Sequence, residues 1–300
     1  MNYIVTPAPH KLSRLTTNDL FAYQAIGLAL CVMYGFIVYS WPVLIVLACS
    51  LGSCILCEFV WCSIKNKKPM LSDASFLVTG LILTCIMPAN AAWYYCIVAG
   101  VVAVSSKYLF GGLGNNIFNP AALGRAILGV CVASLSSFAL QNGSTTLELL
   151  ASGNRSQIIL EDLMLGKAAG ALGTSCMIIL AIVAVVYLIF GIIRWENVLF
   201  AIGGFALYVG IAVGAGSILP YALSGSFLFA TVFMLSDPTT SPYGQVSRAV
   251  YGMLFGVLSG LFLTKNIMGE SGVFLVLLVC NFIAPALDRA MSLFHRGGAK

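Results

Sequence analysis

Apolar residues occur along this chain in long continuous runs, separated by short polar segments. Runs of about 20 apolar residues are typical of membrane-spanning helices, whereas strands of a transmembrane barrel alternate apolar and polar positions. The pattern therefore predicts an all-α polytopic membrane protein with about ten transmembrane helices. We expect the spans at residues 20–39, 43–64, 75–90, 92–110, 119–140, 171–193, 197–217, 220–236, 246–264 and 270–288.

Two of the predicted spans share a short motif. Residues 74–77 read Ala-Ser-Phe-Leu and are followed by Pro88, while residues 225–228 read Gly-Ser-Phe-Leu and are followed by Pro238. The first motif opens the third span, and the second lies in the eighth. Two inverted five-helix repeats would place the motifs in this way. Chance similarity between two apolar stretches is the alternative.

Basic residues are distributed unequally between the two sides that ten spans create. Of the 15 lysines and arginines, only Arg155, Lys167 and Lys265 fall on the side away from the termini. The positive-inside rule then predicts that both termini are cytoplasmic. Residues 1–19 and 289–300 are the expected cytoplasmic tails of a single transmembrane domain, 1–300, and the polar segment 141–170 is the expected outer loop.

Composition agrees with a membrane protein, since 60% of the residues are hydrophobic and 8% are charged. A soluble domain is roughly one quarter charged. The net charge of +5 comes from lysines and arginines in loops, without a basic run interleaved with aromatic residues, so we expect no nucleic-acid partner. Cys54 and Cys57 share a helix face and Cys62 follows, but no fourth ligand is nearby, so no metal site is expected.

The polar turn before the fifth predicted span is a candidate binding site. Glycines and asparagines suit backbone that approaches a ligand closely, and they are poor material for a lipid-facing helix. Pro120 favours a helix start at that position, with Asn119 as its N-cap. The alternatives are a structural turn and, for the arginine, an interfacial anchor. The candidate residues are Gly111, Gly112, Asn115, Asn116, Asn119 and Arg125.

Two acidic residues lie in or beside predicted spans, where ionisable groups are costly and tend to be functional. For Glu58, we expect the carboxylate to extend toward the lysines at residues 65–68. Asp237 belongs to the segment Leu-Ser-Asp-Pro-Thr-Thr-Ser-Pro at residues 235–242. Two prolines and an aspartate make this segment an expected helix stop.

The run FGGLGNNIFNPAALGR at residues 110–125 resembles the signature of the RnfD/NqrB family. This family comprises the D subunit of the Rnf ferredoxin:NAD oxidoreductase and the B subunit of the sodium-pumping NADH:quinone oxidoreductase. Further segments that resemble the family follow in the same order, so that the resemblance covers residues 9–289. The chain lacks a long N-terminal extension, which favours Rnf over the sodium pump. The further segments are residues 73–81, 166–175, 193–195, 233–242 and 281–288.

The resemblance implies a covalently bound FMN. The family joins FMN through a phosphodiester to a threonine, in a motif like Ser-Gly-Ala-Thr-Pro-Leu. Residues 142–147 of this chain read Asn-Gly-Ser-Thr-Thr-Leu, so Thr145 matches the acceptor and Thr146 is a competing acceptor. Asn142, Ser144 and Thr146 depart from the family's pattern. The attachment in the family is on the outer face, which agrees with the predicted side of the 141–170 loop.

The resemblance further implies a membrane flavoprotein subunit of an Rnf-type complex in the prokaryotic cytoplasmic (inner) membrane. Electrons would pass through FMN between ferredoxin and NAD, coupled to export of Na⁺ or H⁺. The implied partners are the other membrane subunits, the outer-face flavin subunit, a flavin transferase and the lipid bilayer. No nicotinamide or ferredoxin site is visible in the sequence, so the chain alone is expected to show no turnover.

A second, non-covalent flavin is predicted at the turn from Gly111 to Arg125, with contact to a neighbouring subunit as the alternative. Amide donors and a cation would stabilise the charge that a flavin gains on reduction. Two other interpretations stay open for the whole chain: a secondary transporter or channel, and a divergent paralogue that has lost the flavin. A ten-span chain with inverted repeats fits the transporter class as well.

Overall fold

The computed structural model describes residues 16–64, 74–89, 91–112, 114–132, 146–152, 158–166, 171–174, 177–224 and 226–297. Most of the predicted N-terminal tail, Thr145 and much of the 141–170 loop lie outside the described residues. Every element in the described ranges is a helix. The helices are α1 (Thr17–Tyr39), α2 (Pro42–Ile64), α3 (Ser75–Ile86), α4 (Trp93–Leu109), α5 (Pro120–Cys131), α6 (Thr146–Ala151), α7 (Leu160–Met164), α8 (Met177–Ile189), α9 (Trp195–Ala212), η3 (Ala215–Ser217), α10 (Ile218–Leu223), α11 (Phe227–Phe233), α12 (Gln245–Thr264) and α13 (Ser271–Gly297).

Each of the ten predicted spans coincides with helix in the structure, which confirms an all-α polytopic membrane protein. Within the described ranges, α1, α2, α9, α12 and α13 are long and apolar enough to cross a bilayer. The α10–α11 pair, bent by 65°, makes a sixth if it is counted as one broken span. The shorter apolar helices α3, α4, α5 and α8 account for the remaining spans.

Three predicted spans are interrupted rather than continuous. The 12 residues of α3 extend for about 18 Å, little more than half of a hydrocarbon core of about 30 Å. This helix ends because Met87, which precedes Pro88, is extended with ψ of 147°. Helix α5 also has 12 residues, and the predicted eighth span is divided between α10 and α11. Apolar composition alone did not predict these breaks in the helices.

The chain contains two halves with the same order of helices. Four helices of the second half, α9, α11, α12 and α13, start 151 to 153 residues after a counterpart in the first half: Pro42 and Trp195, Ser75 and Phe227, Trp93 and Gln245, Pro120 and Ser271. Contacts are repeated as well, since α2 packs on α4 and α4 on α5, as α9 packs on α12 and α12 on α13. This regular offset argues against chance similarity between the two motifs found in the sequence.

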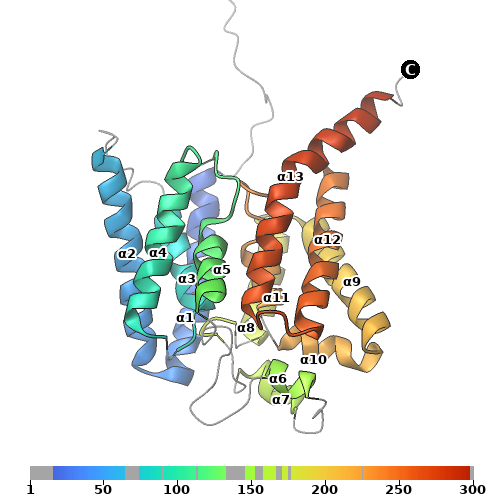
Figure 1. The fold of residues 1–300 in the computed structure, drawn as a ribbon, viewed down its shortest axis with the longest axis horizontal. Coiled ribbons are helices and arrows are strands. Elements are labelled where there is room, and N and C mark those ends of the chain that lie inside the picture. Colours follow the sequence, from blue (N-terminus) through green and yellow to red (C-terminus); the bar gives the residue numbers. More distant parts are fainter. Residues whose placement is uncertain are drawn as a thin grey trace, which may run out of the picture.

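The two halves lie next to each other, with α1–α5 on one side and α8–α13 on the other (Figure 1). Helices α5 and α13 pack against each other at the boundary between them. The short helices α6 and α7 lie at the end of the molecule opposite to the C-terminal end of α13 (Figure 1). The counterpart helices α5 and α13 run in opposite directions (Figure 1), as inverted repeats require.

Small residues allow the closest helix pairs to approach. On α12, a Cβ atom at Gly256 would lie 2.0 Å from the carbonyl oxygen of Ala201 on α9, and one at Gly252 would lie 2.6 Å from that of Asn197. The counterpart helices show the same feature, since a Cβ at Gly100 of α4 would lie 1.9 Å from the hydroxyl of Ser53 on α2. Interfaces built from small residues are typical of helices packed in a membrane.

Candidate functional site

A small polar pocket lies where α1, α3 and the start of α5 meet the turn that follows α11. Its volume of about 30 Å³ has room for about two water molecules. Polar and ionisable side chains contribute much of the lining, which is unusual inside a membrane bundle and makes the pocket a candidate functional site. The polar lining residues are Gln24, Ser75, Thr79, Lys107, Asn116, Asn119, Asp237 and Thr239.

The start of α5 forms one wall of this pocket. Asn119 is the N-cap that the sequence predicts, because its Oδ1 accepts a hydrogen bond of 3.2 Å from the backbone N–H of Ala122. Pro120 follows as the first helical residue. The Asn119 side chain is buried, and its Nδ2 donates to Oδ2 of Asp237 at 3.1 Å. One asparagine therefore caps a helix of the first half and holds a carboxylate of the second.

The turn after α11 forms another wall. The Asp237 carboxylate also accepts hydrogen bonds from the backbone N–H and the hydroxyl of Thr239, at 3.0 and 2.9 Å. The Nδ2 of Asn116 donates to the Thr239 hydroxyl and to the carbonyl of Phe118, both at 3.3 Å. Asn116 is 5% exposed, and its Oδ1 accepts no hydrogen bond from the described residues. This buried acceptor beside the pocket is available to a ligand that carries a donor.

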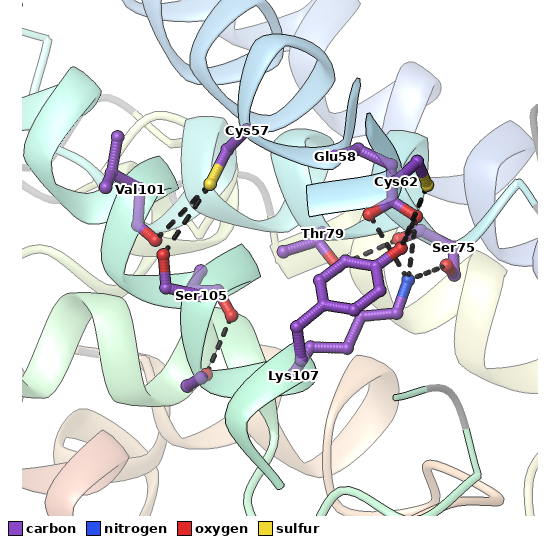
Figure 2. A network of polar contacts seen from close by, with 11 residues as sticks. Cys57, Glu58, Cys62, Ser75, Thr79, Val101, Ser105 and Lys107 are labelled. Carbon is purple, nitrogen blue, oxygen red and sulfur yellow. Dashed lines mark hydrogen bonds and ion pairs between the residues drawn. The ribbon is translucent and has the colours of Figure 1, made fainter. Parts of the chain in front are cut away.

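A buried ion pair completes the site (Figure 2). The Nζ of Lys107, on α4, lies 3.5 Å from each carboxylate oxygen of Glu58, on α2, and 2.8 Å from the hydroxyl of Ser75, on α3. The hydroxyl of Tyr108 donates to Oε1 of Glu58. The Lys107 and Glu58 side chains are 6% and 9% exposed. Since Lys107 and Ser75 line the pocket and Glu58 does not, the pocket has a cationic group backed by a carboxylate.

The sequence did not reveal this pair. Glu58 was expected to extend toward residues 65–68, which lie outside the described residues, but in the structure its partner is Lys107, 49 residues away. Lys107 itself was counted only as one of the basic residues on the cytoplasmic side. The Ser75 motif and the Asp237 segment were visible as motifs, yet nothing in their local sequence predicts that both belong to one pocket.

The six candidate residues of the polar turn separate into groups. Asn116 and Asn119 lie in the pocket, whereas Asn115 is exposed and is not among the lining residues. Gly111 and Gly112 have φ angles of 109° and 95°, which favour glycine, and the N–H of Gly112 closes the end of α4 on the carbonyl of Lys107 at 2.9 Å.

Arg125 lies away from the pocket, in the core at the boundary of the two halves. Its Nε donates to the carbonyl of Ile86 at 3.2 Å, and it is fully buried. An interfacial anchor, the alternative considered for this residue, is therefore wrong.

The other predicted cofactor site is described only in part. Thr145 lies outside the described residues, and Thr146 is the buried first residue of α6. Helix α6 lies at the end of the molecule opposite to the end of α13 (Figure 1). The attachment of FMN to either threonine stays a prediction. Over the ranges that the structure covers, no three His, Cys, Asp or Glu side chains are grouped as ligands of a metal ion.

Known proteins resemble the chain over nearly its whole length. The sequence pattern of the NQR2, RnfD, RnfE family matches residues 4–294. The D subunit of the ion-translocating oxidoreductase complex of Halorhodospira halophila is 27% identical, over 93% of this chain and 91% of that protein. The D subunit of the same kind of complex from Methanosarcina acetivorans is 25% identical, over 96% and 94%.

A second group of relatives matches over a smaller part of their own length. The B subunit of the Na⁺-translocating NADH-quinone reductase of Ectopseudomonas mendocina is 29% identical, over 77% of this chain but 62% of that protein. The same protein from Pseudomonas aeruginosa is 28% identical, also over 77% and 62%. This chain therefore spans less than two thirds of these B subunits and nearly all of the D subunits.

Proposed function

This chain belongs to the NQR2, RnfD, RnfE family, and we propose that it is the D-type membrane subunit of an Rnf-type ion-translocating electron-transport complex. The observation that carries the proposal is that two D-subunit relatives match 93% and 96% of this chain, against 77% for a B-subunit relative. The complex would move electrons between ferredoxin and NAD with export of Na⁺ or H⁺. The multi-pass helical fold supports a place in the bilayer beside the other subunits.

In this proposal the chain holds FMN, joined through phosphate to Thr145, with Thr146 as the competing acceptor. The attachment consumes a side-chain hydroxyl, which both residues supply. Bound flavin provides the electron-transfer chemistry, while this chain fixes its position and excludes competing reactions. The location of α6, opposite to the C-terminal end of α13, agrees with attachment on the outer face if the C-terminus is cytoplasmic.

We further propose the polar pocket as the site of a second, non-covalent flavin. The chemistry of the lining fits the polar edge of a flavin ring, because Lys107 and Ser75 offer donors and Asn116 Oδ1 is a free buried acceptor. The volume of about 30 Å³ does not hold the ring, so binding requires the pocket to widen. We expect the Gly114–Phe118 segment, which contributes Asn116 to the lining, to be the part that moves outward. A Cβ at Gly114 would meet nothing within 4 Å, so this segment has open space beside it.

The pocket residues would then act on the ring through charge and hydrogen bonds. A cation at Lys107 stabilises the negative charge that reduction adds, and Glu58 behind it moderates that effect. Asn119 and Thr239 fix the position of the Asp237 carboxylate through hydrogen bonds to its oxygens.

The attachment is tested with Thr145→Ala and Thr146→Ala in cells that also express the flavin transferase. The expected result is that Thr145→Ala abolishes in-gel flavin fluorescence after denaturing electrophoresis, while Thr146→Ala retains it, because a phosphoester needs the acceptor hydroxyl. Mass spectrometry of the loop peptide checks the residue, and wild-type protein from cells without the transferase is the control. An unmodified wild-type peptide from co-expressing cells would contradict covalent flavin, and a colourless protein would favour the transporter interpretation.

A further inference from the structure

Arg125 is among the largest fully buried side chains of the described part of the chain. It projects from α5 and donates from Nε to the carbonyl of Ile86, the last residue of α3. Glu270, which precedes α13 and is 1% exposed, interacts electrostatically with the Arg125 guanidinium. Glu270 in turn accepts a hydrogen bond of 3.1 Å from the hydroxyl of Ser226, at the start of α11. Two buried ionisable residues from different halves, Arg125 and Glu270, therefore interact electrostatically beside interrupted helices.

The electrostatics of this cluster match the helix ends around it. A cation is favourable at the C-terminal end of α3, and an anion is favourable at the N-terminal ends of α11 and α13. A buried charge without compensating groups is strongly destabilising, and Glu270 and the carbonyl of Ile86 both compensate the Arg125 guanidinium. The turn with Glu270 packs on the last turn of α5, since a Cβ at Gly129 would lie 2.6 Å from that of Ser271.

The inverted repeat relates this cluster to the polar pocket. Positions 151 residues apart are counterparts, so Ser75, Asn119 and Asp237 of the pocket correspond to Ser226, Glu270 and Ile86. Ser226 contacts Glu270, and Ile86 accepts from Arg125. Three pocket residues thus have counterparts, Ile86, Ser226 and Glu270, that lie together farther along α5 than Asn119. The Arg125 side chain lies among these counterparts.

We propose that Arg125 fills an inverted copy of the pocket and thereby closes a polar path for monovalent cations along α5. Arg125 follows Asn119 by six positions, which correspond to about 9 Å of helix, so the filled copy lies close to the open pocket. Asn119 and Asp237 contribute oxygen atoms to the pocket, and Ser226 and Glu270 contribute oxygen atoms to the filled copy. Oxygens are the ligands that hard cations prefer. The seated guanidinium excludes cations by charge and by volume.

The test uses the full-length chain reconstituted into liposomes, with uptake of ²²Na⁺ as the measurement. The variant Arg125→Ala/Glu270→Gln removes the side chain that fills the copy and both buried charges, so that neither is left unpaired. Arg125→Met/Glu270→Gln is the matched control, because a long apolar side chain refills the space. The expected result is uptake at least about tenfold faster for the alanine variant than for the methionine variant. Wild-type vesicles should stay at the level of protein-free vesicles.

Guanidinium ion supplies an independent measurement. Millimolar guanidinium chloride should block uptake in the alanine variant, because the free ion replaces the missing side chain, whereas tetramethylammonium chloride at the same concentration should not. Uptake in the folded alanine variant that equals the wild-type rate overturns the proposal, as does uptake that guanidinium leaves unchanged. If the alanine variant does not elute as a folded protein, uptake by the Arg125→Lys variant is measured instead. It keeps the charge but is shorter, so it should raise uptake, and a wild-type rate in Arg125→Lys contradicts the proposal.

Discussion

Lys107 and Glu58 illustrate how a single charge inside this bundle depends on one distant partner. Their separation of 3.5 Å is long for a charged hydrogen bond, and Ser75 and Tyr108 supply the shorter contacts to the two groups. The four side chains come from α2, α3 and α4, so the network also joins three helices of the first half. It explains why a lysine and a glutamate can be almost completely buried there.

Lys107→Met is expected to destabilise the protein by about 3–5 kcal/mol, because it leaves the Glu58 carboxylate buried without its cation. The double variant Lys107→Met/Glu58→Gln should regain most of that loss. Thermal unfolding in detergent, followed by intrinsic tryptophan fluorescence, measures both. Lys265→Met is the control, since Lys265 is exposed at the end of α12 and should change stability by less than about 1 kcal/mol. Equal stability of the single and double variants would show that the pair is not coupled.

Residues whose role is set by near neighbours were predictable, and residues with distant partners were not. Asn119 is an N-cap because Pro120 and Ala122 follow it, and the sequence contains all of that information. The partners of Glu58 and Arg125 lie on other helices, and only the packing of the helices brings them together. An isolated acidic or basic residue in an apolar run therefore indicates that a partner exists, without indicating which one.

At the scale of elements, the contact between α9 and α12 is the closest in the second half. Gly256 and Gly252 on α12 face backbone atoms of α9, so backbone meets backbone without side chains between them. An added methyl group does not fit in such an interface. Its neighbour would be a backbone carbonyl oxygen, which cannot move aside, whereas the end of a flexible side chain can.

Gly256→Ala should destabilise the protein by about 2–4 kcal/mol, since the new Cβ would lie 2.0 Å from the carbonyl oxygen of Ala201. Gly203→Ala, on the other helix of the same pair, is the matched control. A Cβ at Gly203 meets nothing within 4 Å, so the change should be neutral or slightly stabilising, because alanine favours helix. Melting temperatures of the two purified variants provide the comparison, and similar values would contradict the close approach of α9 and α12.

Element boundaries were predicted well where the end of a helix has a local cause. The Thr16–Asp19 capping box starts α1 three residues before the predicted position, and both of its hydrogen bonds are short-range. Interruptions inside apolar stretches were missed, because the residues beyond a break remain apolar. Met87 stays fully buried after α3 has ended, so hydropathy cannot mark that boundary.

At the scale of the whole molecule, the arrangement of basic residues predicts which side of the membrane each loop occupies. A membrane-impermeant thiol reagent applied to intact cells should label Asn154→Cys, in the predicted outer loop, and should not label Asn66→Cys. The ten native cysteines require a cysteine-free or blocked background. After the cells are opened, Asn66→Cys should react, which confirms that its thiol is accessible. Labelling of Asn66→Cys in intact cells would contradict the predicted topology.

In the sequence, only four similar residues indicated the inverted repeat. In the structure, the order and packing of the helices in both halves follow it. Side chains diverge between halves because the two ends of the molecule meet different surroundings, while helix lengths and connections are kept by the packing. The offset of 151 to 153 residues between counterpart helices, from Pro42 and Trp195 to Pro120 and Ser271, is therefore clearer in the structure than in residue identities.

The contact of α5 with α13 also has a consequence for biogenesis. When α5 has left the ribosome and entered the membrane, all helices of the first half are present and can pack on each other. Helix α13 is made much later. Until α13 arrives, Arg125 lacks the Glu270 charge, and its position in the lipid has to be tolerated or shielded during that interval. Assembly of the second half then ends that exposure, so the last helix to be made also completes the electrostatics of the first half.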